Sequence, residues 1–417
     1  MNGRRETARS GPGRSRRGSL RPSRWAVTGA ALVALAGSPG FGTAASAETR
    51  PLTMRAYDQR VQDGIDLIYQ LRFEAADEHF ATFIAADPGN PLGHFFHAMV
   101  DWWRVLIDLE DESGDEAFYA RLARCIEVCD RRLAEDADDF EAVLFKGGAI
   151  GFRGRLRGDR DQFLHAARDG LRSLPLLKKS RQMEPANKDI LFGQGIYNYF
   201  RVVIPERHPV VKAFIWMLDD GDRELGLRQL EEVAREGRYA RAEARYFLAQ
   251  IHRVFEDDPG TALRYLEQLH GQYPDNALFH RYRARVLVDL RRWDEAVALY
   301  RQAIERAERG QRGYHARCHI ESLYYVGKRA FLEGRYGEVV TVMSAADSLS
   351  RSLGESPTAQ FVQGFGPLAN LYLGMAGDAL ERRDLARSRY ERVLELPNHG
   401  SSHKLARRYL AEPYGPR

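Results

Sequence analysis

The sequence predicts an all-α protein, a superhelical solenoid of about eight degenerate helix-turn-helix units with inserted segments. Two observations predict this fold. A frame of one small residue, three residues, one large residue, two residues and a second small residue recurs in phase along the 417-residue chain. Several frames are followed by a proline, which ends one helix and positions the next. With 44% hydrophobic and 11% aromatic residues, the chain is also too apolar to be intrinsically disordered.

The first 47 residues have the order of a secretory signal peptide. Residues 1–24 hold eight arginines and one glutamate, and residues 25–47 hold no charge. The uncharged stretch opens with a 13-residue apolar run, residues 25–37, which is too short to span a membrane. Ala45-Ser46-Ala47 then forms a small-x-small cleavage site. We expect cleavage after Ala47 and export to the periplasm or outer envelope; a retained signal anchor is the alternative.

The signal peptide also dominates the charge of the chain. The sequence has 62 basic and 58 acidic residues, and without the eight arginines and one glutamate of residues 1–24 the numbers are 54 and 57. The mature body is therefore slightly acidic, and overall charge does not indicate a nucleic-acid partner. Arg16-Arg17 loosely resembles a twin-arginine export motif, so the choice between general and twin-arginine export stays open.

The clearest helix pair occupies residues 278–308. An amphipathic helix is expected to end near Leu290, and a second helix follows a short turn. The second helix carries the frame as Ala296, Tyr300 and Ala303. The small residues let the two helices approach closely, and the tyrosine fills the gap between them.

The same frame recurs in seven other places, each expected on the second helix of a pair. The recurrences are Ala76/Phe80/Phe83, Cys125/Cys129, Ser173/Leu177/Ser180, Gly226/Leu230/Val233, Ala262/Leu266/Leu269, Val339/Met343/Ala346 and Ala386/Tyr390/Val393. The first helices carry a matching small residue at Gly64, Ala98, Ala249, Ala284, Gly327 and Gly374. Within this pattern the cysteines are packing residues rather than a metal or redox pair. After the last unit, Ser401 to Leu410 is expected to form a capping helix with Ser401 or Ser402 as its N-cap.

Taken together, these units resemble the tetratricopeptide repeat (TPR) family over roughly residues 57–397. The best matches to the family pattern are Leu373-Gly374, Ala296-x3-Tyr300 and Ala262-x3-Leu266 followed by Pro274. The resemblance implies a superhelix whose concave groove is lined by the first helices and binds a protein or peptide.

The spacing of the units departs from the family norm. Most intervals between frames exceed the family period of about 34 residues, which requires longer helices or inserted segments. We expect an acidic loop at Asp108–Glu116, a basic inserted segment at Arg153–Asp161 and a third insert at Val202–Asp222. The third insert is expected to contain a short apolar helix between Pro209 and Asp219.

The third insert carries a weaker resemblance. From Phe192 to Leu230 the sequence has a Gly-rich aromatic helix, an Ile-Pro turn, an apolar helix and then Gly221-Asp222-Arg223-Glu224-x-Gly226-Leu227. This segment is similar to eukaryotic TPR proteins related to the mitochondrial outer-membrane inclusion-clearance factor. The similarity implies a non-enzymatic adaptor that acts near a membrane.

Inward positions of units five to seven predict a partner-binding groove. They are Tyr246, Gln250, Arg253, Arg281, Arg285, Asp289, Tyr324 and Lys328. Four cations and two aromatic rings on one surface favour an extended or acidic peptide, with arginines bound to its carboxylates. The alternative is a solvated face on which the arginines pair with Glu243 or Asp289.

Other candidate sites are weaker. Trp102 and Trp103 are expected to be core residues or, alternatively, aromatic anchors for a ligand in the groove. His94, His97 and Asp101 share a helix face that could bind zinc, but a further strong ligand is not evident, so we predict helix packing there and no metal. The familiar catalytic and nucleotide-binding motifs are absent from the sequence, and we predict neither an enzyme nor a cofactor.

The sequence thus predicts three parts: a signal peptide (1–47), an N-terminal TPR-like array with long inserts (48–240) and a C-terminal TPR array with a capping helix (241–417). The predicted function is an exported, non-enzymatic TPR scaffold that binds a protein or peptide partner in its groove. The alternative is a membrane-proximal assembly factor, not transmembrane after cleavage, that docks through the insert 202–222. Its docking residues would be Phe214, Ile215 and Trp216.

Overall fold

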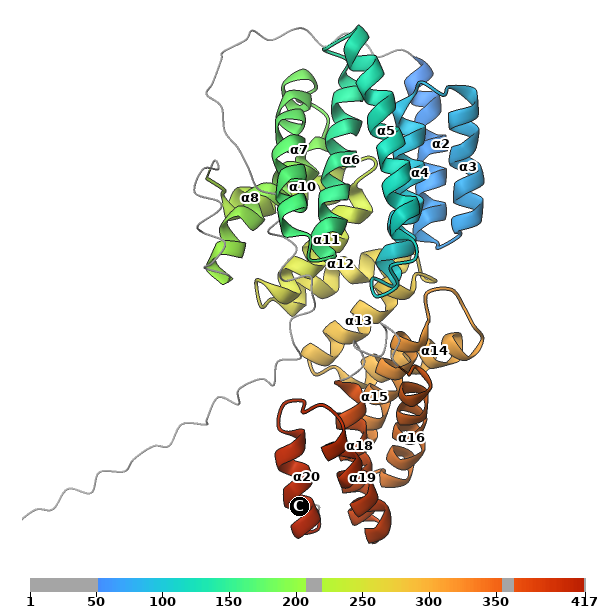
Figure 1. The fold of residues 1–417 in the computed structure, drawn as a ribbon, viewed down its shortest axis with the longest axis vertical. Coiled ribbons are helices and arrows are strands. Elements are labelled where there is room, and N and C mark those ends of the chain that lie inside the picture. Colours follow the sequence, from blue (N-terminus) through green and yellow to red (C-terminus); the bar gives the residue numbers. More distant parts are fainter. Residues whose placement is uncertain (1–51, 208–219, 355–363, 416–417) are drawn as a thin grey trace, which may run out of the picture.

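The computed structural model describes residues 52–207, 220–354 and 364–415 (Figure 1). Within these ranges the chain forms 17 α-helices and no β-strand, so the all-α prediction is confirmed. The helices follow one another as eight pairs and a terminal helix. None of the described helices is long and apolar enough to cross a membrane.

The helix bounds match the predicted pairing. The first helices are α2 (Leu52–Tyr69), α4 (Pro91–Ile107), α6 (Phe140–Asp159), α8 (Ile190–Arg207), α11 (Arg241–Val254), α13 (Ala277–Asp289), α15 (Ala316–Leu332) and α18 (Phe365–Ala379). The second helices are α3 (Phe73–Ala86), α5 (Asp115–Glu135), α7 (Phe163–Met183), α10 (Arg223–Glu236), α12 (Pro259–Gln272), α14 (Trp293–Glu308), α16 (Tyr336–Ser352) and α19 (Arg383–Glu395). Each of the eight frames lies on one of the second helices.

The small and large residues of the frames pack against each other as the sequence predicts. A Cβ added at Gly64 would lie 2.4 Å from the Phe80 ring, and one added at Gly374 would lie 2.3 Å from the Tyr390 ring. Only glycine therefore allows the first and second helices of these units to approach this closely. Cys125 and Cys129 are fully buried on α5, which confirms their role in packing.

The turns inside the pairs also repeat. Leu71, Asp161, Arg291 and Glu381 each follow the end of a first helix, and all four adopt positive φ angles between 58° and 60°. A non-glycine residue in this left-handed region costs about 1–2 kcal/mol. The recurrence of one unfavourable backbone conformation in four separate units shows that they are copies of one structural motif.

One of the inserted segments was wrongly assigned from the sequence. Arg153–Asp161 is not a separate insert, because helix α6 continues to Asp159. Two of its arginines pair with the next helix, since Arg153 and Arg157 both bind the buried carboxylate of Asp169, at 2.6 Å each. The acidic segment Asp108–Glu116 does contain a loop, which ends where α5 begins.

The third insert is only partly described. Helix α8 continues through the predicted Ile-Pro turn to Arg207, with Pro205 inside its last turn. The apolar segment and the proposed docking residues Phe214, Ile215 and Trp216 lie outside the described residues, as does the predicted signal peptide, residues 1–47.

The predicted capping helix is confirmed as α20 (Ser402–Ala411), which packs on α18 and α19. Ser401 stands at the N-cap position, but its side chain makes no capping hydrogen bond. The hydroxyl of Ser402 instead accepts a hydrogen bond from the His399 amide at 3.1 Å.

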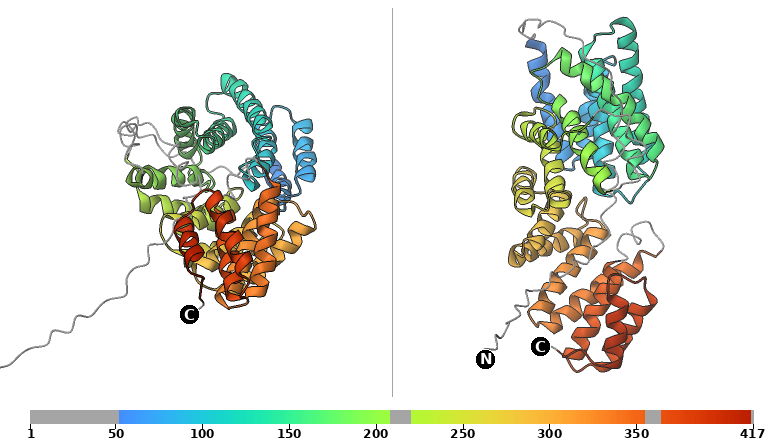
Figure 2. Two further views of the ribbon diagram at one scale, coloured as in Figure 1. Left: turned by 60° about the horizontal axis from the view of Figure 1, so that its bottom comes forward. Right: turned by 90° about the vertical axis from the view of Figure 1, so that its left-hand side faces the viewer.

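The helices are stacked as a solenoid that curls back on itself. Each helix packs on the next, and first helices also contact one another, as in α2 with α4, α4 with α6 and α15 with α18. In Figure 1 the units up to α11 form the upper part of an elongated molecule, and α13 to α20 form the lower part. In the left view of Figure 2, which is turned by 60° from Figure 1, the blue, green and yellow-green helices follow one another along an arc.

Candidate functional site

The first turn of the superhelix is closed by contacts between residues far apart in sequence. The ring of Tyr69, at the end of α2, lies 4.8 Å from the Trp103 ring of α4 and 5.1 Å from the Tyr273 ring that follows α12. The rings of Trp103 and Phe279 on α13 are 5.6 Å apart. These four aromatic residues are all buried, so α2 and α4 pack against the concave side of the later units.

Hydrogen bonds hold this closure in register. Asn276 donates to the backbone carbonyl of Tyr69 at 2.8 Å, and Tyr273 donates from its hydroxyl to Asp66 at 2.7 Å. Asn276 is fully buried, and its side-chain oxygen also caps the N-terminus of α13. The same side chain therefore holds α2 in place and begins α13.

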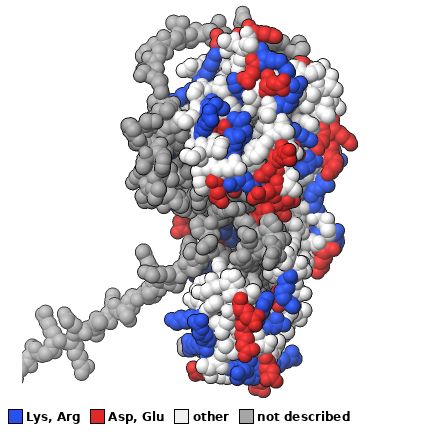
Figure 3. All heavy atoms as spheres, viewed as in Figure 1, with Lys and Arg blue, Asp and Glu red and all other residues white. Residues whose placement is uncertain are grey.

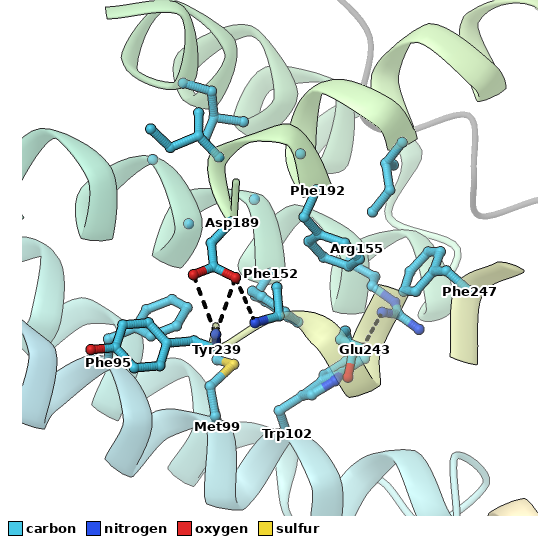
Figure 4. Close-up of a pocket in the computed structure, with 18 of the residues that line it drawn as sticks. Phe95, Met99, Trp102, Phe152, Arg155, Asp189, Phe192, Tyr239, Glu243 and Phe247 are labelled. Carbon is cyan, nitrogen blue, oxygen red and sulfur yellow. Dashed lines mark hydrogen bonds and ion pairs between the residues drawn. The ribbon is translucent and has the colours of Figure 1, made fainter. Parts of the chain in front are cut away.

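An apolar cavity of about 210 Å³ lies inside the closed turn. Its walls come from α2, α4, α6, α7, α8 and α11, and they include twelve aromatic side chains. Figure 4 shows the rings of Phe95, Phe152, Phe192 and Phe247 around this space, with Met99 and Trp102 from α4 below them. The volume exceeds the engineered cavity of about 150 Å³ that binds benzene, and it lies below the roughly 300–1,000 Å³ of sites for drug-sized ligands.

A buried ion pair stands at one side of the cavity. Arg155 on α6 and Glu243 on α11 meet at 3.2 Å, and both residues are less than one-tenth exposed. The guanidinium is stacked between the Trp102 and Phe247 rings, 4.4 Å from each centroid. Glu243 also accepts a hydrogen bond from the Tyr69 hydroxyl at 3.4 Å. Burial raises the pKa of Glu243 despite the neighbouring cation.

A second carboxylate, Asp189, is used to start a helix. It accepts hydrogen bonds from the backbone amides of Arg238, Tyr239 and Ala240 at 2.9, 3.1 and 3.0 Å, just before α11 begins. Burial raises the pKa of this carboxyl group, while the three amides stabilise its anion. With Arg155 and Glu243 paired and Asp189 bound by amides, the cavity presents no uncompensated charge.

Gln250 is a polar side chain of the wall that has no such compensation. Gln250, on the third turn of α11, lines the cavity and is 5% exposed. Its amide nitrogen has no hydrogen-bond partner among the described residues. A buried donor without a partner costs about 1–3 kcal/mol, so a group that accepts from Gln250 would be favoured in this space.

The structure does not assemble the predicted groove as an open surface. Tyr246 and Tyr324 are buried, at 0% and 5% exposure. Trp103 of α4 lies 6.2 Å from the Tyr246 ring, and Tyr324 packs on Phe365 of α18 at 5.1 Å. Sequence periodicity could not show all of this burial, because Trp103, one of the residues that cover Tyr246, comes from an N-terminal unit.

The predicted cations are mostly neutralised within the chain. Arg253 pairs with Asp289 at 2.8 Å, which is the predicted alternative. Arg285 pairs with the buried carboxylate of Glu321. Arg281 is 7% exposed and Lys328 is half-buried, and neither forms an ion pair within the described residues. Repulsion among four unpaired cations, the basis of the predicted anion site, is therefore absent from the structure.

Both tryptophans of α4 are core residues, and both also line the cavity. Trp102 is fully buried and Trp103 is 2% exposed. Their position therefore fits both alternatives, a core residue and an aromatic anchor, because the concave face of the first turn is also its core. Their role as ligand anchors stays a prediction.

The zinc alternative on α4 has no support in the geometry. His94 bonds the carbonyl of Pro88 at 3.0 Å, His97 faces Asp77, and Asp101 pairs with Arg104 and Arg121. Among the described residues no group of three or more His, Cys, Asp or Glu side chains could hold a metal.

Sequence reasoning missed two of the polar residues beside the cavity, Arg155 and Asp189. Arg155 lies in the predicted basic insert, and the signal that could have placed it on α6 is the absence of proline from residues 140–159. Gln250, by contrast, stands among the predicted inward positions.

Comparisons with known proteins agree with the repeat architecture. Residues 256–317, which include α12, α13 and α14, match the family model described as tetratricopeptide repeat. No curated protein matches the sequence. The resemblance to proteins of the inclusion-clearance type is not shown by these matches and stays a prediction.

Two solved structures are similar to the chain at low identity. The structure described as "Human IFIT1 dimer with PPP-AAAA" has a TM-score of 0.41 and 11% identity, covering 78% of this chain and 69% of that chain. The P58(IPK) TPR domain has a TM-score of 0.23 and 15% identity, covering 86% of this chain and 97% of that chain. These scores are too low to indicate partners. The family match therefore identifies a tetratricopeptide repeat at residues 256–317, within an all-α array of helix pairs that repeats one frame eight times.

Proposed function

We propose that the chain is an exported, non-enzymatic scaffold that binds a protein partner at the concave side of its first superhelical turn. TPR arrays are protein-interaction scaffolds, and each unit of such an array buries its apolar face against its neighbours. What distinguishes this chain is the closure of the first turn around an apolar cavity. The cavity, rather than a charged groove, is the proposed anchor point for the partner.

The observation that carries this proposal is the composition of the cavity wall. A folded core closes its apolar surfaces against one another and leaves few voids larger than a water molecule. Here about 210 Å³ is left in a wall from six helices, five of which contribute aromatic side chains. Well-packed aromatic pockets are where protein interfaces concentrate binding energy.

The charge distribution also favours an apolar anchor over an acidic one. On the face shown in Figure 3, basic and acidic side chains are interspersed, without a broad patch of one sign over the described residues. Only Arg281 and Lys328 of the predicted groove are without an ion pair in the described part of the chain. An acidic partner would therefore find two unpaired cations of the predicted groove, Arg281 on α13 and Lys328 on α15. Neither residue lines the cavity.

Export is part of the proposal and depends on the sequence alone. The order of an arginine-rich segment, an apolar run and Ala45-Ser46-Ala47 supports cleavage after Ala47 and a periplasmic or outer-envelope location. N-terminal sequencing of protein from the cell envelope should return Glu48 as the first residue. Material that begins at Met1 or Asn2 would contradict export by cleavage.

Partner binding can be tested with a variant that fills the cavity. Val254 lines the cavity and is half-buried, so Val254→Phe places a ring in the space without removing a polar contact. Val297 is half-buried on α14 and does not line the cavity, so Val297→Phe is the matched control. Proteins captured on the mature wild-type chain should be identified, purified and titrated against both variants.

The expected result is at least a tenfold loss of affinity for Val254→Phe, about 1.4 kcal/mol, and little change for Val297→Phe. Equal binding by Val254→Phe and wild type would place the partner site elsewhere and overturn the proposal. Circular dichroism on both variants should confirm that helix content is retained.

A further inference from the structure

We infer that the cavity of the first turn takes one uncharged aromatic side chain of the partner, and that the amide of Gln250 donates a hydrogen bond to an acceptor on it, as the hydroxyl of tyrosine would provide. This inference rests on the proposed function and specifies the chemistry of its anchor. It follows from the size, the charge balance and the polarity of the cavity, taken in turn.

Size limits the occupant to a single group. The volume of about 210 Å³ is larger than the roughly 150 Å³ cavity that takes benzene, yet smaller than sites built for cofactors or drug-sized ligands. One substituted aromatic ring satisfies both limits.

Charge balance excludes an ionised occupant. The one arginine in the wall, Arg155, is already bound to Glu243 and covered on both faces by Trp102 and Phe247. Asp189 is bound by three backbone amides. A carboxylate or ammonium entering this space would lose its hydration without gaining a counter-ion, which costs far more than the burial of a neutral group.

The wall chemistry favours a ring over an alkyl chain. Phe95, Phe152 and Phe192 approach from three different helices, and Met99 adds a polarisable thioether. Aromatic pairs in edge-to-face or offset arrangements attract one another beyond the effect of their buried area, and sulfur–ring contacts add to this attraction. An alkyl chain gains only the area term.

A hydrogen bond from Gln250 would orient the occupant in the cavity. Gln250 is 5% exposed, it lines the cavity, and its amide nitrogen has no partner among the described residues. The wall around Gln250 is mostly apolar. A hydrogen-bond acceptor on the occupant would therefore give the amide nitrogen of Gln250 the partner that it lacks among the described residues. Toluene and p-cresol, the side-chain analogues of phenylalanine and tyrosine, differ by this one acceptor.

The test uses the mature full chain and four small probes: toluene, p-cresol, 4-methylbenzoate and n-decanol. Affinities are measured by ligand-detected NMR or calorimetry for the wild type, for Gln250→Leu and for Val254→Phe. Toluene and p-cresol should bind the wild type, with p-cresol about three- to tenfold tighter, as expected for one hydrogen bond. Gln250→Leu should bring that ratio to one or below while toluene binding is retained, and Val254→Phe should lose both.

Other outcomes overturn the inference. If 4-methylbenzoate binds as well as toluene, the Arg155–Glu243 pair opens to anions and the site is not neutral. If n-decanol binds tenfold tighter than p-cresol, the occupant is an alkyl chain from a free lipid rather than a side chain. If Gln250→Leu leaves the p-cresol to toluene ratio unchanged, Gln250 does not direct the ligand. Should Gln250→Leu fail to fold, Gln250→Met retains the chain length and gives the same comparison.

The failure of this inference can be separated from failure of the proposed function. If none of the probes binds while Val254→Phe still loses the protein partner, the partner-binding proposal stands and the aromatic anchor is wrong. If the probes bind as expected while Val254→Phe keeps its partner, the cavity takes an aromatic ligand that is not part of the protein partner, and both the anchor and the proposed function are wrong.

Discussion

Arg155 and Glu243 meet at 3.2 Å beside the cavity, although 88 residues separate them in sequence. One stands on α6 and the other on α11, so the pair exists only because the superhelix closes its first turn. The same closure brings Tyr69 against Glu243 and Trp102 over the guanidinium. The energetics of this pair therefore report on the closure itself.

We predict that Arg155→Met destabilises the protein by about 3 kcal/mol, because it leaves the carboxylate of Glu243 buried without its cation. The double variant Arg155→Met/Glu243→Leu should recover at least half of that loss, since both charges are then removed. The measurement is the free energy of unfolding in urea. Additive costs for the two substitutions would show that the pair is not coupled. As a control, Arg253→Met breaks the partly exposed pair with Asp289 and should cost less than about 1 kcal/mol.

Removal of one side chain should open the first turn of the superhelix. Tyr69→Ala removes a buried ring that contacts Trp103, Tyr273 and Phe279, and large-to-small changes of this kind cost about 3–5 kcal/mol. We expect faster amide hydrogen exchange in α11 and α13 and a larger radius of gyration by X-ray scattering.

The matched control is Tyr390→Ala, which removes a fully buried ring from the last unit. It should speed exchange in α18 to α20 and leave α11 and α13 unaffected, because α18 and α19 pack on each other and on α15, α16 and α20. Equal effects of the two variants on all helices would mean that the array unfolds as one unit.

The frame of small and large residues makes a prediction of its own. Gly374→Ala would place a Cβ 2.3 Å from the Tyr390 ring, so we expect a loss of about 1–3 kcal/mol by overpacking. Gly271→Ala, in α12, meets nothing within 4 Å and should stabilise the helix by about 0.5–1 kcal/mol. Thermal unfolding of both variants checks the pair, and a stabilising Gly374→Ala would contradict the close approach of α18 and α19.

Stability should depend on pH through two histidines. Burial lowers the pKa of His270 to about 4 and of His280 to about 3, against about 6.5 in an unfolded chain. Below pH 6.5 the unfolded state binds more protons, so the free energy of unfolding should fall as the pH drops, by up to about 2 kcal/mol for each histidine at pH 5. Urea unfolding at pH 7 and pH 5 measures this. His280→Gln should lower the difference, and the same change at the exposed His165 should not.

The repeat could be predicted from the sequence because it is a local property. Ala296, Tyr300 and Ala303 specify one helix pair through contacts within about 30 residues, and the structure buries all three. The wrong prediction of a basic inserted segment at Arg153–Asp161 has a physical reason: Asp169, the partner of Arg153 and Arg157, lies on the next helix, so the arginines themselves do not show that they are paired.

The site could be predicted only in part, because it forms where the first turn of the superhelix closes on itself. Gln250 and Trp102 were identified as inward or anchoring positions from helix periodicity alone. Which residues face them is decided by how far the superhelix turns before α2 meets α13, and the sum of many small rotations between units fixes that angle. The burial of Tyr246 by Trp103 has the same cause.

The most direct test of the central claim is a crystal structure of the mature protein grown with 4-bromotoluene, collected at the bromine absorption edge. We expect an anomalous peak inside the first turn, bounded by Trp102, Phe152 and Phe247, with the Arg155–Glu243 pair intact beside it. The result that would contradict the account is a closed turn in which side chains fill the space, or bromine bound only at other places on the molecule.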